Sequence, residues 1–271
     1  MPEPDTPNTQ APIGVFDSGV GGLSVLDHLV EMMPHEHFVY FGDTANMPYG
    51  QKHLTELSIL VRRITTWLVH QKQVKLLVVA CNTASLVVPH EITVPVVDPI
   101  TAVCHQIAHD DAVRRIGVMA TTATVMSESY PRILHQLHPQ KKMEQSACPG
   151  LAYMIEQGES DGPVSEFLIQ ESLSPLQEWQ MDALVLGCTH YPFARQQIAN
   201  ILSPSVRVLD PAIPMAHRVH QLLKSQHSLR TDGAGQVDYF VSGPPDHFLR
   251  VARRLPLAHI QPGLPTQLDL D

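Results

Sequence analysis

Two cysteines in this chain stand in matching places, each at the end of a short apolar run. Cys81 follows LLVVA and precedes Asn82 and Thr83, while Cys188 follows ALVLG, with His190 two positions further on. A thiolate can remove a proton and a thiol can return one, and histidine exchanges protons readily near neutral pH. The pattern therefore predicts a site for acid and base chemistry that uses two thiols.

Both thiols have a candidate route to activation. Small polar residues after each cysteine suit the first turn of a helix, and a helix amino terminus lowers the pKa of a nearby thiol from about 8.5. His190 is the acid/base helper that we expect for Cys188. For Cys81 we expect Asp17, which follows IGVF in the turn FDSGVGG, where glycines allow a ligand to approach the backbone closely.

A buried cysteine that only packs is the alternative at each position. A single cysteine after a strand is more often a small buried hydrophobe than a base or a nucleophile. The matched contexts of Cys81 and Cys188, each with a threonine within two residues, favour chemistry. We expect Cys104, in the apolar stretch TAVCHQIA, to pack in the core, and we leave open whether Cys148 packs or takes part in chemistry.

The residue pattern predicts neither a metal site nor a cofactor. Of the 16 histidines, His105 and His109 have the spacing that places both on one helix face, but no HExxH or Cys-x-x-Cys pattern accompanies them. Ser24 occupies the place of the third glycine of a dinucleotide-binding turn. The lysines lie in polar contexts that do not favour a Schiff base.

Composition restricts the class of partner and the compartment. The 271 residues, 44% of them hydrophobic, can bury one large core or two smaller ones. A formal net charge of −9 argues against nucleic acid or an anionic membrane surface as a partner. The polar start has no signal-peptide pattern, and no apolar run is long enough to cross a membrane. We therefore expect a cytosolic (cytoplasmic) protein with reduced thiols.

Short β-branched runs alternate with helix-like segments along the chain. We expect strands at Ile13–Phe16, Phe38–Phe41, Leu76–Ala80, Val94–Val97, Ile116–Ala120, Ala183–Leu186, Val206–Leu209 and Val237–Val241. Such alternation is typical of parallel sheets built from βαβ units, and unbroken apolar runs indicate strands that are covered on both faces. The predicted fold class is α/β.

Three segments recur in the same order in the two halves. IGVFDSG, LLVVACNTAS and VPVVDPITA match IGVMATTAT, ALVLGCTHYP and VRVLDPAIP. Either the chain is duplicated, or α/β units resemble one another at this level of detail. A duplication predicts two similar α/β domains with mainly parallel sheets, related by pseudo-two-fold symmetry, with the site in the cleft between them. The first domain would comprise residues 12–98 and 211–271, and the second 99–210, after a flexible tail at 1–11.

Four motifs together carry a resemblance to a known family: FDSGVGGLSVL, YFGDTANMPYG, VVACNTAS and LVLGCTHYP. In this order they are similar to the motifs of bacterial glutamate racemases, within the wider family of cofactor-independent Asp/Glu racemases. The resemblance runs from about Ile13 into the final helical region. Two places depart from the usual pattern, since Asn46 stands where many relatives have arginine, and CPGLAY replaces the more common CPLFVP.

The resemblance implies roles for the residues at matching positions. Cys81 and Cys188 would be the two catalytic bases, with Asp17 and His190 as their respective helpers and Glu156 as a catalytic carboxylate beside His190. Substrate would be held by Asp17, Ser18, Tyr49, Gly50, Asn82, Thr83, Thr121, Thr189 and His190.

The activity that the resemblance implies is the interconversion of L- and D-glutamate without a cofactor, by α-proton transfer between two cysteines. It would supply D-glutamate for peptidoglycan. The resemblance also implies a homodimer and, for some relatives, activation by a cell-wall precursor. Two alternatives remain: an aspartate or other amino-acid racemase of the same superfamily, and a non-catalytic two-lobed protein that binds a small anion.

Overall fold

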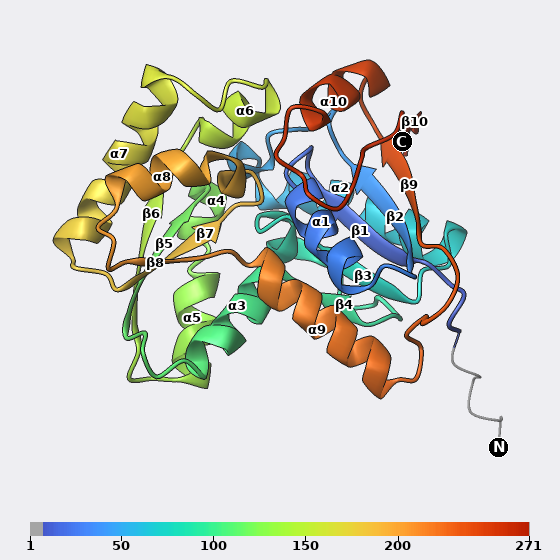
Figure 1. Cartoon of the computed structure of the whole chain (residues 1–271), viewed down its shortest axis with the longest axis horizontal. Helices are drawn as coiled ribbons and strands as arrows, with labels where there is room; N and C mark the ends of the chain where they lie inside the picture. The colour runs from blue at the N-terminus through green and yellow to red at the C-terminus, as the bar shows by residue number, and fades with distance from the viewer. Residues whose placement is uncertain (1–7, 271) are drawn as a thin grey trace.

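Two parallel β-sheets form the centre of the protein, each flanked by helices (Figure 1). The computed structural model describes residues 8–270. The first sheet has the strand order β10-β9-β2-β1-β3-β4. Its strands are β1 (Ile13–Asp17), β2 (His37–Gly42), β3 (Leu76–Val79), β4 (Val96–Val97), β9 (Gln236–Val241) and β10 (Thr266–Gln267).

The second sheet is smaller and comes entirely from the middle of the chain. Its strand order is β6-β5-β7-β8. Its strands are β5 (Arg115–Ala120), β6 (Lys142–Ala147), β7 (Ala183–Gly187) and β8 (Arg207–Leu209). Every strand pair in the described part of the chain is parallel, which confirms the predicted α/β class.

The two sheets share one strand arrangement. In the first, β1 lies between β2 and β3, with β4 beyond β3; in the second, β5 lies between β6 and β7, with β8 beyond β7. The registers agree as well, because Ile13 pairs with Leu76 in the first sheet and the matching Ile116 pairs with Ala183 in the second. The internal repeat in the sequence is therefore also a repeat in topology.

The sequence does not predict β6, the counterpart of β2. Its residues, KMEQSA, form no apolar β-branched run, and they are only partly buried. Because β6 is an edge strand, it has one neighbouring strand, and its side chains need not form a continuous apolar segment. The two-residue strand β10 at the edge of the first sheet was not expected either.

Helices cover the sheets and connect their strands. The α-helices are α1 (Leu23–Met32), α2 (Leu54–Thr66), α3 (Pro99–Ala108), α4 (Thr122–Met126), α5 (Ser129–Leu137), α6 (Leu151–Glu156), α7 (Pro163–Glu178), α8 (Arg195–Ile201), α9 (Ala212–Ser225) and α10 (Pro245–Ala252). Short 3-10 helices are η1 (Tyr49–Gln51), η3 (Ala84–Val87) and η4 (Tyr191–Ala194), and η2 (Trp67–Gln71) is π-helical.

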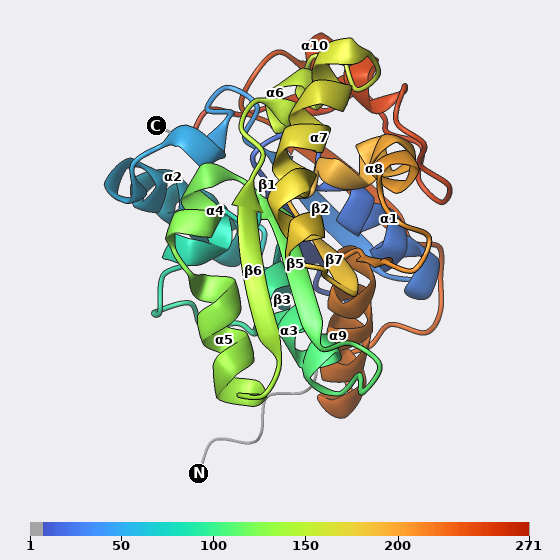
Figure 2. The same ribbon diagram turned by 90° about the vertical axis from the view of Figure 1, so that its left-hand side faces the viewer.

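Each sheet is buried on both faces. In the first sheet, α1 and α9 cover the face that carries Ile13 and Val15, and α2 covers the face that carries Phe16. In the second sheet, α6, α7 and α8 cover one face, and α3 and α5 cover the other (Figure 2). Burial on both faces explains the unbroken apolar runs of the strands. Cys104 lies fully buried in the last of these cores, which confirms its packing role.

The chain ends and the surface add further observations. Residues 8–11, which were expected to be part of a flexible tail, form a turn. Lys75 Nζ, from elsewhere in the chain, donates to the carbonyl of Thr9 in this turn at 3.1 Å. Residues 1–7 lie outside the described residues.

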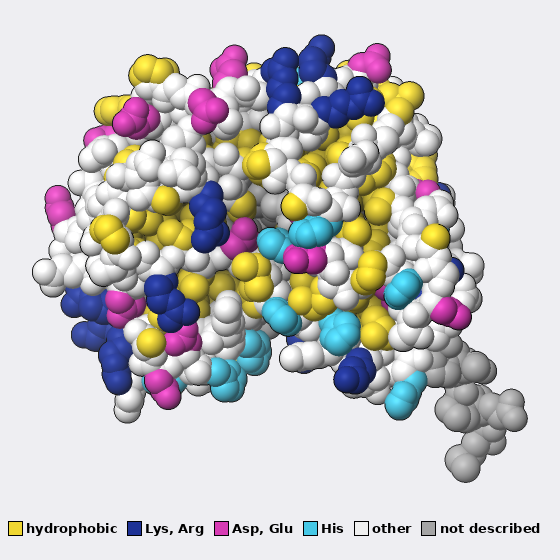
Figure 3. Space-filling model, in the orientation of Figure 1, with side chains coloured by type: hydrophobic (Ala, Val, Ile, Leu, Met, Phe, Trp, Pro, Cys, Tyr) yellow, Lys and Arg dark blue, Asp and Glu magenta, His cyan; other side chains and the backbone are white. Residues whose placement is uncertain are grey.

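No described helix is both long and apolar enough to cross a membrane. On the face drawn in Figure 3, basic and acidic side chains are interspersed. The domain boundaries after residues 98 and 210 remain predictions.

Candidate active site

A cleft between the carboxyl ends of the two sheets contains both thiols. It is open to solvent on one side and, with that open part included, contains about 570 Å³ of space free of protein atoms. Side chains that follow five different strands reach its wall: Ser18 after β1, Cys81 after β3, Thr121 after β5, Cys148 after β6 and Cys188 after β7. Cys81 and Cys188 thus share one cavity, which they enter from the two duplicated halves.

The Cys81 thiol lies just beyond β3 and is 6% exposed. Its Sγ donates to Ser18 Oγ at 3.9 Å. Burial, followed by the negative charge of Asp17, raises the pKa of Cys81 above its ordinary value, although a hydrogen bond with Ala84 acts to lower it. The expected lowering of the Cys81 pKa is wrong, because only the short 3-10 helix η3 follows and burial dominates.

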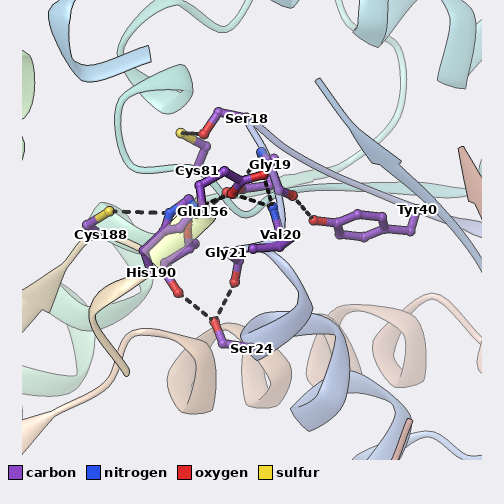
Figure 4. Close-up of polar contacts among 12 residues, drawn as sticks. Ser18, Gly19, Val20, Gly21, Ser24, Tyr40, Cys81, Glu156, Cys188 and His190 are labelled. Carbon is purple, nitrogen blue, oxygen red and sulfur yellow. Dashed lines mark hydrogen bonds and ion pairs between the residues drawn. The ribbon is translucent and has the colours of Figure 1, made fainter. Parts of the chain in front are cut away.

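Cys188 lies beside one ring nitrogen of His190, and the other ring nitrogen contacts the carboxylate of Glu156 (Figure 4). The distance from Cys188 Sγ to His190 Nδ1 is 3.8 Å, and that from His190 Nε2 to Glu156 Oε2 is 2.8 Å. Burial lowers the pKa of His190, but the hydrogen bonds with Cys188 and Glu156 outweigh burial and raise this pKa well above its ordinary value of 6.5. The raised pKa favours the protonated, cationic form of His190 beside the Cys188 sulfur.

Asp17 is fully buried and acts on Cys81 through its charge rather than through a contact. Asp17 Oδ2 accepts from Thr189 Oγ1 at 3.0 Å, and Oδ1 accepts from the backbone N–H of Gly19 at 3.1 Å. Burial raises the pKa of Asp17, while the nearby His190 acts to lower it. The residue expected to help Cys81 thus makes its side-chain hydrogen bond to Thr189, in the other half of the protein.

Glu156 joins the two halves behind the cleft. Its Oε2 accepts from the backbone N–H of Val20 at 2.9 Å, in addition to its contact with His190 (Figure 4). A Cβ on Gly19 would lie 2.4 Å from Glu156 Oε2, and a Cβ on Gly21 would lie 2.5 Å from His190 Nδ1. The glycines of this turn therefore make room for side chains of the other half.

The other residues implied by the resemblance fall into two groups. Those that line the cavity are Ser18, Tyr49, Gly50, Asn82, Thr83, Thr121, Thr189 and His190. Asp17 and Glu156 lie behind the wall, and both are almost fully buried. Tyr49 is held in place because its hydroxyl donates to the carboxylate of Asp43, beyond the end of β2.

Several residues of the cleft wall were not expected from the sequence. They are Met47, Pro48, Gln51, Thr122, Pro149, Gly150, Ala152 and Tyr153, and Cys148, whose role the sequence left open, also belongs to the wall. Cys148 donates to Leu168 O at 3.6 Å, and burial raises its pKa to about 11. The signal that would have placed Cys148 at the cleft is the strand β6, since the residue directly follows its carboxyl end.

The fold and the cleft together define a class of protein. Within residues 8–270, no three or more His, Cys, Asp or Glu side chains are arranged so that they could hold a metal ion. What the cavity does offer is a pair of thiols from two duplicated α/β halves, backed by an aspartate, a histidine and a glutamate. These groups are suited to proton transfer to and from a small substrate that is bound between the two halves.

Comparison with known proteins agrees with that class. The family model described as Asp/Glu/Hydantoin racemase matches residues 13–218, and the chain belongs to this family. The glutamate racemase of Thermoanaerobacter pseudethanolicus is 39% identical over 245 residues, which cover 90% of this chain and 92% of that protein. The resemblance found in the four sequence motifs is thereby confirmed.

Two solved glutamate racemases have the same fold. The structure from Francisella tularensis, in complex with D-glutamate, has a TM-score of 0.88 and 32% identity, and the match covers 97% of this chain and 99% of that one. The Escherichia coli structure, in complex with L-glutamate and the activator UDP-MurNAc-ala, has a TM-score of 0.72 and 27% identity over 90% of this chain and 94% of that one.

Proposed function

We propose that this protein is an isomerase that interconverts L- and D-glutamate, with Cys81 and Cys188 as its two acid/base groups. The observation that carries the proposal is that both thiols line one cavity, each from its own half of the fold. Glutamate as the substrate is supported by relatives that match nearly the whole chain and are glutamate racemases.

Inversion at the α-carbon requires groups on both of its faces. A single fixed base reaches only one face, so it would return the proton to the side from which it came. With two thiols, one acts as a thiolate and removes the α-proton, while the other gives its own proton to the opposite face. After one turnover the two sulfurs have exchanged protonation states, and the reverse reaction uses them in opposite roles.

The carbanion formed between these steps needs stabilisation from the protein. Fixed donors that hold the α-carboxylate act on the developing charge, as donors do in an oxyanion hole. Ser18, Thr83 and Thr121 line the cavity, and their hydroxyls are available for this purpose, whereas the Thr189 hydroxyl donates to Asp17. His190, which touches Cys188, can also exchange a proton with that sulfur between turnovers.

The partners and the compartment are part of the proposal. Free thiols at Cys81, Cys104, Cys148 and Cys188 are suited to the reducing cytosol, where the protein would supply D-glutamate for peptidoglycan. Activation by a cell-wall precursor is supported by the activator in the Escherichia coli relative. A homodimer is the assembly expected from the resemblance, and light scattering of the purified protein tests it.

Circular dichroism of L- and D-glutamate in the presence of the purified protein tests the activity. We expect the signal of either enantiomer to decay to zero with no added cofactor. The same assay with L-aspartate separates glutamate from aspartate as the preferred substrate. Binding of glutamate without any loss of optical activity would identify a non-catalytic anion-binding protein and overturn the proposal.

A further inference from the structure

Three threonine hydroxyls form a closed group where the two halves meet at the cleft. Thr83 Oγ1 lies 2.9 Å from Thr121 Oγ1 and 3.4 Å from Thr124 Oγ1, and the distance from Thr121 Oγ1 to Thr124 Oγ1 is 3.0 Å. Thr83 follows the strand β3 of the first sheet, whereas Thr121 and Thr124 follow β5 of the second. Each hydroxyl is thus within hydrogen-bond distance of both others, across the boundary between the halves.

Only two of the three threonines line the cavity. Thr83 and Thr121 belong to its wall, but Thr124 does not, and Thr124 is 0% exposed. Thr124 can therefore influence a bound molecule only through the other two side chains. The backbone N–H of Thr124 also donates to Thr121 Oγ1 at 3.4 Å, because Thr121 is the N-cap of α4.

The number of hydroxyl protons in this group indicates what Thr124 can do. Three hydroxyls carry three protons, and the three contacts can use all of them. A carboxylate in the cleft accepts hydrogen bonds only, so Thr83 and Thr121 must turn their protons towards it. Their two oxygens, 2.9 Å apart, then have no proton between them. Thr124 has a donor for each oxygen, because its backbone N–H donates to Thr121 Oγ1 and its hydroxyl proton can go to Thr83 Oγ1, 3.4 Å away.

We propose that Thr124 is a positioning residue, which directs the hydroxyl protons of Thr83 and Thr121 into the cleft for a substrate carboxylate. The inference rests on the proposed function, because it needs an anionic substrate at this wall. It adds a residue outside the cavity to the group that determines how tightly the substrate is held.

Two substitutions of Thr124 separate this role from simple packing. Thr124→Val keeps the shape of the side chain and removes its hydroxyl, whereas Thr124→Ser keeps the hydroxyl and removes a buried methyl group. We expect Thr124→Val to raise the KM for both enantiomers of glutamate about tenfold, with a change in kcat below about threefold. Thr124→Ser should lower the Tm through its lost methyl, but keep KM within about twofold of the wild-type value.

Thr65→Val is the matched control. Thr65 is also a buried helical threonine, 2% exposed, but its hydroxyl donates to Arg62 O in α2, and it does not line the cleft. This variant should keep the wild-type KM, which would show that the loss of a buried threonine hydroxyl elsewhere does not affect substrate affinity.

Steady-state racemisation by circular dichroism, together with thermal unfolding of each variant, decides the matter. A purely structural Thr124 would give the opposite ranking, with a normal KM for Thr124→Val and a larger defect for Thr124→Ser, and that result overturns the inference while the proposed function stands. A wild-type protein without racemase activity on glutamate overturns both.

Discussion

The carboxylate of Glu156 lies 2.8 Å from Nε2 of His190, and both side chains are almost fully buried. Glu156 belongs to the second half of the fold, but it also accepts the backbone N–H of Val20 from the first. A carboxylate out of contact with water needs such donors, because burial of an uncompensated charge is costly. The turn of the first half therefore fixes a charge that, after the contact with Cys188, acts to raise the pKa of His190.

The stability of the protein should depend on pH through this pair. Because the pKa of His190 is raised above 6.5 in the folded state, protonated His190 contributes its full stability below about pH 6.5. That contribution is lost as the pH rises through the raised value. Glu156→Gln removes one cause of the raised pKa. At low pH the wild type should therefore have a larger free energy of unfolding than Glu156→Gln, and we expect this difference to shrink by about 1–3 kcal/mol between pH 6 and pH 9.

Urea unfolding of both proteins across this pH range measures the advantage. Asp238→Asn is the control, since it removes the partly exposed partner of His37, which should matter by less than about 1 kcal/mol at any pH. A wild-type advantage over Glu156→Gln that stays constant or grows with pH would contradict the assignment.

Replacement of Asp17 should change the pH profile of catalysis for only one of the two enantiomers, the one from which Cys81 removes the proton. The negative charge of Asp17 is, after burial, a cause of the raised pKa of Cys81. Asp17→Asn removes this charge, so Cys81 should become a thiolate at lower pH. We expect the rising limb of kcat/KM, in the direction that uses Cys81 as the base, to move by roughly one unit towards acid, even though the maximal rate falls.

Measurements of kcat/KM against pH for L- and D-glutamate separately detect this change. Asp210→Asn, at a buried carboxylate outside the cleft wall, is the control and should leave both profiles in place. Equal shifts for both enantiomers with Asp17→Asn, or none, would show that its charge does not act on Cys81.

Features that depend on neighbouring residues can be predicted from the sequence, whereas contacts between residues far apart along the chain cannot. Cys81 and Cys188 are predictable because each depends on local residues, an apolar strand and a polar turn. The strand β6 was not predicted, because its partly exposed edge position leaves no apolar run, and without that strand the role of Cys148 stayed open. The contact of Asp17 with Thr189 joins residues 172 positions apart, and nothing in either local sequence indicates it.

The raised pKa of Cys81 is unpredictable for a related reason. Sequence reasoning assigns the thiol to a helix amino terminus, where the pKa would fall. Only the packed structure shows that the thiol is 6% exposed and near Asp17, so that burial and charge both act in the opposite direction. Burial and long-range charge depend on the whole fold, whereas the local turn does not.

Removal of one thiol at a time should separate exchange from inversion. In deuterium oxide, Cys81→Ser retains Cys188, which can remove the α-proton of one enantiomer and return deuterium to the same face. We expect inversion to fall by at least about 10²-fold, while exchange persists in one enantiomer. Cys188→Ser should show exchange in the other enantiomer.

Proton NMR of the α-position, together with circular dichroism, distinguishes these outcomes. Cys104→Ala, at a thiol packed in the core outside the cleft, is the control and should retain racemisation. If both serine variants exchanged the same enantiomer, the two thiols would not lie on opposite faces of the substrate.

The glycine-rich turn offers a last prediction, which concerns space rather than charge. A Cβ on Gly21 would lie 2.5 Å from both His190 Nδ1 and Thr189 Oγ1. Neither group can easily withdraw, because His190 is bonded to Glu156 and Thr189 donates to Asp17. Gly21→Ala should therefore push the two halves apart at the cleft, lowering racemisation at least about tenfold and costing about 1–3 kcal/mol of stability.

Gly263→Ala provides the matched control, since its added Cβ would meet nothing within 4 Å. Activity and the Tm of this variant should equal those of the wild type. A conformational need for glycine cannot explain a defect at Gly21, because its φ is not among the positive values. A fully active Gly21→Ala would mean that the turn can retreat from His190, and that the close contact between the halves is not required for catalysis.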